Sequence, residues 1–178
     1  MQRFMLVYGA IAGTVVIGFM IVLLSLGAGS GEHSTPSVLV GYLIMLVALS
    51  LIFVGIKRYR DRELGGVIKF GTAAKLGLGI TLVASVVYVA GWEVHQSLTD
   101  YAFIGQYTEA VIAGKKAEGV SGAELDELVA EMEVMKQRYA SPLFRMPMTF
   151  LEIFPVGLVI TLFAAGLLRN SRFLPATT

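Results

Sequence analysis

Four long apolar stretches constrain this chain more than any other feature of its sequence. They cover residues 4–28, 37–56, 73–95 and 148–168. A helix rises about 1.5 Å per residue, so about 20 apolar residues cross the hydrocarbon core of a bilayer, which is about 30 Å thick. Only 15% of the 178 residues are charged, whereas a soluble domain has about a quarter. We therefore expect an all-α integral membrane protein, with residues 1–178 forming one membrane domain built as a four-helix bundle.

Lysine and arginine residues lie at one set of span ends. The segment between the second and third spans holds Lys57, Arg58, Arg60, Arg62 and Lys69, and the short segment before the second span holds none. Arg3 precedes the first span and Arg169 follows the fourth. Because short loops rich in these residues stay in the cytoplasm, we expect a multi-pass protein of a bacterial inner (plasma) membrane with cytoplasmic termini. Basic clusters of this kind also bind anionic lipid headgroups, which predicts headgroup contacts for Lys57, Arg58, Arg60 and Arg62.

The segment 97–147 between the third and fourth spans is too polar to insert and is expected on the outer side. Within it, Ser121 and Glu124 have the spacing of a capping box, which predicts that a helix begins there. Apolar residues then recur at helical spacing: Leu125, Leu128, Met132, Met135 and Tyr139. A weaker stripe precedes Gly119, formed by Tyr101, Ile104, Tyr107 or Thr108, and Val111, and is expected to continue the third span. Gly119 is expected to separate the two stripes, so together they predict an outer helical hairpin or arm.

Nearly the whole of this sequence resembles a known family. The residues that carry the resemblance are Phe53-Val54-Gly55-Ile56-Lys57-Arg58-Tyr59-Arg60-Asp61, Gly65-Gly66, Phe70-Gly71, Gly77-Leu78-Gly79-Ile80-Thr81, Tyr88, Trp92, Glu152, Pro155-Val156-Gly157-Leu158 and Ala164-Ala165. In order and spacing they resemble the bacterial membrane-protein family catalogued as domain of unknown function four-one-nine-nine. The resemblance implies a four-span inner-membrane protein and brings no established activity, substrate or partner.

Few ionisable groups lie within the spans, where a charge at the helix centre costs roughly 2.5 to 3.5 kcal/mol. Glu93 and Glu152 both lie toward the outer side, and His95 and Tyr42 are expected at a similar depth. If these four residues converge, they form a candidate intramembrane polar site for protons or cations. The alternative is that the acids lie at the wet interface, and their position within a turn or two of the headgroups favours this alternative. Glu152 is the stronger candidate because Pro155 follows it and can disturb the helix near a cavity.

Small residues recur at four-residue spacing in two spans, as Gly9 and Gly13 in the first and as Gly77, Thr81 and Ser85 in the third. Small residues let helix backbones approach closely in lipid. Packing within one bundle and a dimer interface both use this rule, and we favour packing within the bundle.

The sequence contains no recognisable catalytic or metal-binding motif. It has no cysteine, its two histidines are His33 and His95, and no histidine or acid spacing suggests a metal site. We expect no enzymatic activity, no cofactor, no metal and no nucleic-acid partner.

Two functional hypotheses remain open. The first is a non-enzymatic membrane scaffold or accessory protein whose arm, through Leu125, Leu128, Met132 and Met135, binds another membrane or periplasmic protein or a second copy of the chain. The alternative is a small proton- or cation-coupled transporter or channel, with homo-oligomerisation supplying further helices. In both, the lipid bilayer surrounds the spans.

Overall fold

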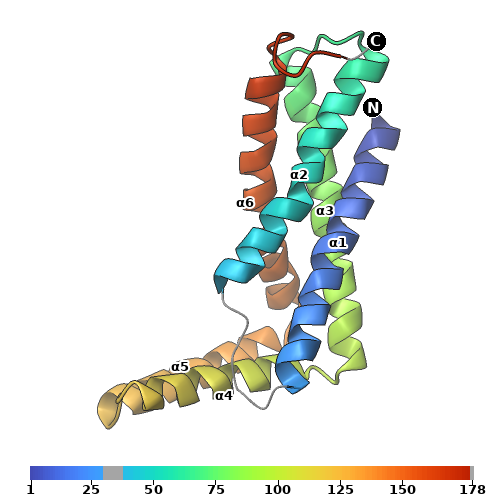
Figure 1. The fold of residues 1–178 in the computed structure, drawn as a ribbon. Coiled ribbons are helices and arrows are strands. Elements are labelled where there is room, and N and C mark those ends of the chain that lie inside the picture. Colours follow the sequence, from blue (N-terminus) through green and yellow to red (C-terminus); the bar gives the residue numbers. More distant parts are fainter. Residues whose placement is uncertain (30–37, 177–178) are drawn as a thin grey trace.

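The structure, a computed structural model, describes residues 1–29 and 38–176, with side chains placed for 1–25 and 41–176. Its helices are α1 (Gln2–Gly29), α2 (Val38–Glu63), α3 (Phe70–Leu98), α4 (Ala102–Ala117), α5 (Ala123–Tyr139) and α6 (Pro142–Leu168). Figure 1 shows α1, α2, α3 and α6 as an upright bundle, and α4 and α5 side by side at one end of it. The expected turn before the second span, with Pro36, lies outside the described residues, as does His33.

The fold class predicted from the sequence is confirmed. The described residues contain helices and no strand, and four of the helices are long and apolar enough to cross a membrane. In lipid, every backbone N–H and C=O must be satisfied within the protein, which a helix does by itself. The chain is therefore a membrane-embedded, multi-pass helical protein.

The spanning helices extend beyond the apolar stretches. Helix α2 has 26 residues and continues through the charged segment after Ile56, so it is about 39 Å long and exceeds the hydrocarbon core by about 9 Å. An ion pair between Lys57 Nζ and Asp61, 2.5 Å long, supports its last turns. Helix α6 begins at Pro142, six residues before the apolar run at Met148, and continues through Pro147 and Pro155. Its first turn consequently brings Arg145 to the end of the bundle opposite the chain termini.

Helix α3 packs closely against α1 through glycine. A Cβ atom at Gly13 would lie 2.6 Å from the carbonyl oxygen of Ala84, and one at Gly9 would lie 2.8 Å from that of Ile80. A side chain at either position would push the two backbones apart, so the absence of one permits the contact. The prediction that these glycines serve packing within one bundle is confirmed.

The contact between α3 and α6 uses the same principle with two residue types. Gly77 faces Thr161, and Gly157 faces Thr81, so that each threonine fills the space opposite a glycine. The two threonine hydroxyls lie 3.1 Å apart and are buried. A hydrogen bond between them satisfies both polar groups within the apolar core.

Helices α4 and α5 form a hairpin that projects sideways, crosswise to the bundle (Figure 1). We call these two helices the arm. The expectation that the third span continues into the weaker stripe is wrong, because α3 ends at Leu98 and the chain turns through Asp100 and Tyr101, with φ of 50° and 55°. Thr108 rather than Tyr107 is buried in α4. Gly119, with φ of 93°, separates α4 from α5, as predicted.

The predicted capping box is wrong in detail. Helix α5 begins at Ala123, and the residue at its N-cap is Gly122, with φ of 62° and no side-chain cap hydrogen bond. The positive φ is one that glycine adopts readily, so the helix boundary falls at this residue and not at Ser121. Glu124 and Asp126 lie in the first turn instead, where negative charge stabilises the helix dipole.

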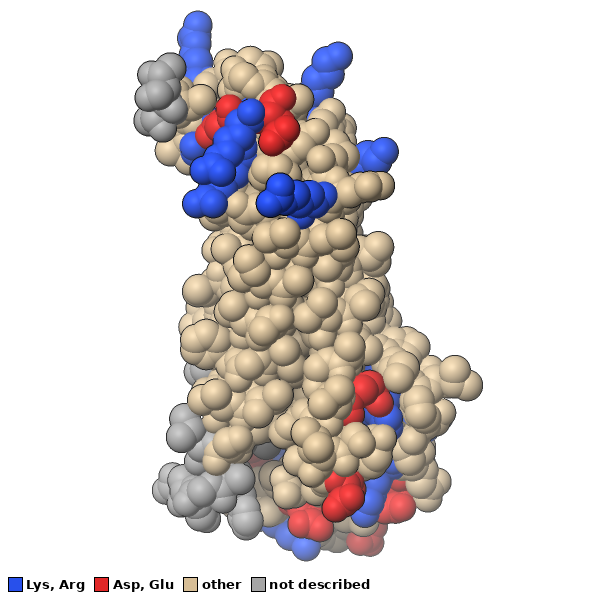
Figure 2. Space-filling model, turned by 90° about the vertical axis from the view of Figure 1, so that its right-hand side faces the viewer, with Lys and Arg blue, Asp and Glu red and all other residues tan. Residues whose placement is uncertain are grey.

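Charge is segregated along the molecule. On the face of the molecule that Figure 2 shows, a broad band carries neither basic nor acidic residues. It lies between an end dominated by Lys and Arg and an end that carries both positive and negative charges. Both chain ends lie at the basic end, and the arm lies at the other (Figure 1). The uncharged band is the part of the surface that suits the bilayer's hydrocarbon core.

Candidate functional site at the base of the arm

Arg145 is the most heavily bonded charged group at the end of the bundle that carries the arm. Its side chain is 1% exposed, and it forms a bidentate ion pair with Glu93 of α3, with Nε and Nη2 at 2.7 and 2.6 Å from the two carboxylate oxygens. Nη1 donates to the carbonyl oxygen of Tyr139 at 2.9 Å. Charge-assisted, bidentate pairs are the strongest hydrogen bonds that side chains form. Arg145 therefore ties the start of α6 to α3 and to the end of α5.

Two tyrosine rings surround this guanidinium group. The Cζ atom of Arg145 lies 4.8 Å from the ring centre of Tyr101 and 5.7 Å from that of Tyr139. Both distances are within the range of attractive cation–π contacts. Tyr101 reaches this position because its backbone is in the left-handed region, which turns the chain sharply between α3 and α4.

The hydroxyl group of Tyr139 is the second link between the arm and the bundle. It accepts hydrogen bonds from Trp92 Nε1 at 2.8 Å and from Gln96 Nε2 at 3.4 Å. Burial raises the pKa of Tyr139, so its hydroxyl stays protonated. Gln96 Oε1 is buried without a hydrogen-bond partner among the described residues.

We call Trp92, Glu93, Gln96, Tyr101, Tyr139 and Arg145 the arm-base cluster. They come from α3, the turn after it, α5 and α6. The carboxylate and the guanidinium neutralise each other, the two tyrosine rings stack on the guanidinium, and Trp92 and Gln96 donate to the Tyr139 hydroxyl. Because its charged groups are paired with each other, the cluster acts as a brace between helices.

The four residues predicted to form an intramembrane site occupy different surroundings. Glu93 pairs with Arg145, whereas Glu152 is exposed on α6 and accepts a hydrogen bond, 3.4 Å long, from the buried Tyr88 hydroxyl. His95 lies beside Trp92, with ring centres 5.5 Å apart. Tyr42 is 48% exposed on α2. Within the described part of the chain, no hydrogen bond or ion pair joins any two of these four.

Sequence reasoning missed Arg145 and Tyr101 as members of a site. Arg145 was included in the polar outer segment, and only its position three residues after Pro142, among Leu143, Phe144 and Met146, hinted at a helix that carries it back to the bundle. No glycine or proline marks the left-handed turn at Tyr101. For these reasons spacing alone could not place either residue.

The stripe assigned to partner binding lies on the less exposed face of α5. Leu125, Leu128, Met132 and Met135 are each partly buried, whereas the residues between them are exposed. Helix α4 is the element that packs along α5. We infer that these four side chains hold the hairpin together, which leaves the exposed residues of α5 for any partner.

Arg60 corrects the expected set of headgroup contacts at the basic end. It is 0% exposed and donates to the carbonyl oxygens of Leu168, at 3.4 Å, of Phe173, at 3.0 Å, and of Leu174. The last carbonyls of α6 have no partner within the helix, and Arg60 supplies one while holding the segment that follows. Arg60 therefore cannot contact lipid headgroups, whereas Arg58 and Arg62 are exposed and Lys57 is partly so.

Fold and cluster together define a class: a multi-pass helical membrane protein with an extramembrane hairpin braced against one end of its bundle. Among His, Cys, Asp and Glu, the described residues contain no group that could hold a metal ion. Residues 7–170 match the family described as "Protein of unknown function (DUF4199)". The chain belongs to that family. No curated protein and no solved structure matches it.

Proposed function

We propose that this protein is a non-enzymatic scaffold or accessory protein of the bacterial inner membrane, which binds a partner through its arm. The basic end of the bundle faces the cytoplasm, because short segments rich in Lys and Arg are retained there. Both chain ends then lie in the cytoplasm, and the arm lies in the periplasm, along the periplasmic surface of the inner membrane. The partner is a membrane or periplasmic protein or a second copy of the chain.

The observation that supports this proposal is the arrangement of the arm itself. Helices α4 and α5 have 16 and 17 residues and project by about 24 Å. Contacts between the arm and the bundle gather at the base of the arm, where Tyr139 and Arg145 lie. Ordering a projecting hairpin costs conformational entropy. Binding of a partner at its exposed surface would explain why the chain keeps such a hairpin.

The exposed residues of α5 supply the chemistry for recognition. Five of them are acidic: Glu124, Asp126, Glu127, Glu131 and Glu133. Complementary charge steers association and sets specificity more than it sets raw affinity. A partner with a basic surface fits this face.

Proton- or cation-coupled transport draws less support from the described residues. Glu93 is neutralised by Arg145, and Glu152 bonds to Tyr88 without a second acid or histidine beside it. Two grooves in the bundle are lined by apolar residues and one serine, and neither includes Glu152. A carrier would need a polar path, which neither groove supplies.

Photo-crosslinking in cells tests the scaffold proposal. A photoreactive residue at Glu131, which is exposed, should form an adduct with another protein or with a second copy of the chain. The same residue at Met132, which is partly buried beside α4, should react within the arm. Glu127→Lys with Glu124→Lys should lower the adduct at position 131 roughly tenfold, since rim charges govern association.

Two results would overturn the proposal. One is an adduct yield at position 131 that the charge reversals leave unchanged. The other is a yield no higher than that obtained from Arg62, which is exposed at the opposite end of the bundle.

A further inference from the structure

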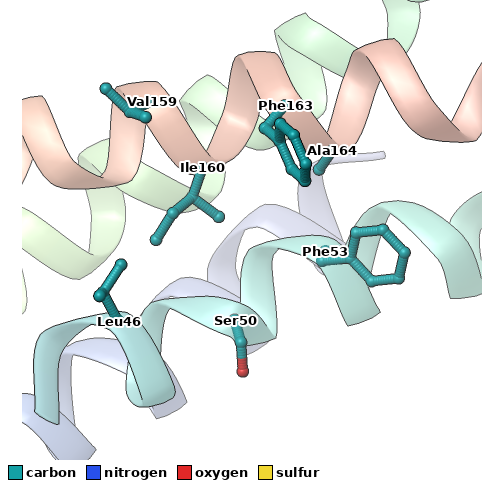
Figure 3. Close-up of a pocket in the computed structure, with 7 residues that line it drawn as sticks. All are labelled: Leu46, Ser50, Phe53, Val159, Ile160, Phe163 and Ala164. Atoms are coloured by element: carbon teal, nitrogen blue, oxygen red, sulfur yellow. The ribbon is translucent and has the colours of Figure 1, made fainter. Parts of the chain in front are cut away.

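A narrow groove lies between α2 and α6 (Figure 3). Leu46, Ser50 and Phe53 line it from α2, and Val159, Ile160, Phe163 and Ala164 line it from α6. The Ser50 hydroxyl donates to the carbonyl oxygen of Val47 at 2.6 Å, so its proton is already used within the helix. The groove consequently presents a hydrocarbon surface to whatever occupies it.

The dimensions of the groove select its occupant. Leu46 and Phe53 are seven residues apart, about 11 Å along the helix. A volume of about 270 Å³ over that length corresponds to a cross-section of about 25 Å². A helix with a diameter of about 10 Å has a cross-section of about 80 Å² and does not fit. A single hydrocarbon chain does.

The end of the groove nearer the chain termini carries basic residues. Phe53 is followed one turn later by Lys57, on the same face of α2. Lys57 Nζ pairs with Asp61 at 2.5 Å, and its other N–H groups remain for a further anion. The ring of Phe53 also meets that of Phe173 edge-on at 6.4 Å, and the exposed Arg172 precedes Phe173 in the chain. From Leu46 to Lys57 is about 16 Å, the depth of one leaflet of a 30 Å core.

We propose that this groove binds one acyl chain of an anionic phospholipid from the leaflet at the basic end, with its phosphate held by Lys57 and Arg172. Apolar lining, cross-section, depth and charge all match this one ligand class. The site does not depend on the arm or on a protein partner. The site gives Lys57 a role that differs from that of Arg58 and Arg62. Those two residues lie on another face of α2 and contact the membrane surface without binding a particular lipid.

Native mass spectrometry of the full chain in detergent, with added dioleoyl phosphatidylglycerol or dioleoyl phosphatidylcholine, tests the proposal. The wild type should retain phosphatidylglycerol at a lipid concentration roughly tenfold lower than it needs to retain phosphatidylcholine. Ser50→Phe, which fills the groove from an exposed position, should abolish retention of both lipids. Val54→Phe, at a position that does not line the groove, should leave retention unchanged.

A second pair of variants isolates the headgroup. Lys57→Gln with Arg172→Gln should remove the preference for phosphatidylglycerol, whereas Arg58→Gln with Arg62→Gln, which removes the same charge, should preserve it. Equal retention of the two lipids by the wild type, or an equal loss in both double variants, would overturn the proposal. A doubled protein mass that Ser50→Phe abolishes would do so too, because it would identify a second copy as the occupant.

Discussion

Replacing Arg145 by Met should lower the free energy of unfolding by about 2 to 4 kcal/mol, since breaking an enclosed ion pair leaves the other charge without its partner. Glu93 keeps part of its solvent contact, with 18% of its side chain exposed, which places the expected loss below that of a fully buried pair. The carbonyl oxygen of Tyr139 also loses its donor. We expect the arm to detach from the bundle in this variant before the bundle itself unfolds.

The single tryptophan of the chain reports this change directly. Trp92 lies in the arm-base cluster, and its indole N–H bonds to Tyr139. Its emission in detergent should shift to longer wavelength in Arg145→Met and should stay unchanged in Arg138→Met, where the arginine is exposed on α5. In the double variant with Glu93→Gln the loss should be smaller than the sum of the two single losses. Equal effects of Arg145→Met and Arg138→Met would show that the brace is not structural.

The second large effect is expected at the contact between α1 and α3. Gly13→Leu places a Cβ atom 2.6 Å from the carbonyl oxygen of Ala84, which belongs to the backbone and cannot rotate away. The helices must separate, at a cost of about 3 kcal/mol or more for an overpacked core. Gly18→Leu on the same helix meets nothing within 4 Å and should be close to neutral.

Titration with sodium dodecyl sulfate, followed by circular dichroism, measures this difference. The unfolding midpoint of Gly13→Leu should fall well below that of the wild type, and that of Gly18→Leu should not. If the two variants unfold together, α1 does not pack on α3 through its glycines.

The spans and the small-residue contacts could be predicted because lipid permits few solutions. A long apolar run must become a helix, and glycines at four-residue spacing permit close contact wherever two such helices meet. The hairpin could be predicted as well, since Gly119 interrupts two stripes of helical period. These features depend on local pattern alone.

The arm-base cluster and the direction of the arm depend on contacts between distant residues. Arg145 meets Glu93 across 52 positions of the chain, and Tyr101 turns through a backbone conformation that its residue type rarely adopts. Arg60 looks like its basic neighbours in sequence, yet it is enclosed because the segment after α6 folds over it. Only the packed structure distinguishes a brace or a cap from a surface charge.

The proposed function depends most on a topology in which the arm and the chain ends lie on opposite sides of the membrane. The chain has no cysteine, so Ser121→Cys, between α4 and α5, and Ser171→Cys, after α6, each introduce one thiol at an exposed position. A membrane-impermeant maleimide applied to intact spheroplasts should label the Ser121→Cys variant at once and the Ser171→Cys variant only after lysis. Labelling of both variants before lysis, or the reverse order, would contradict the account.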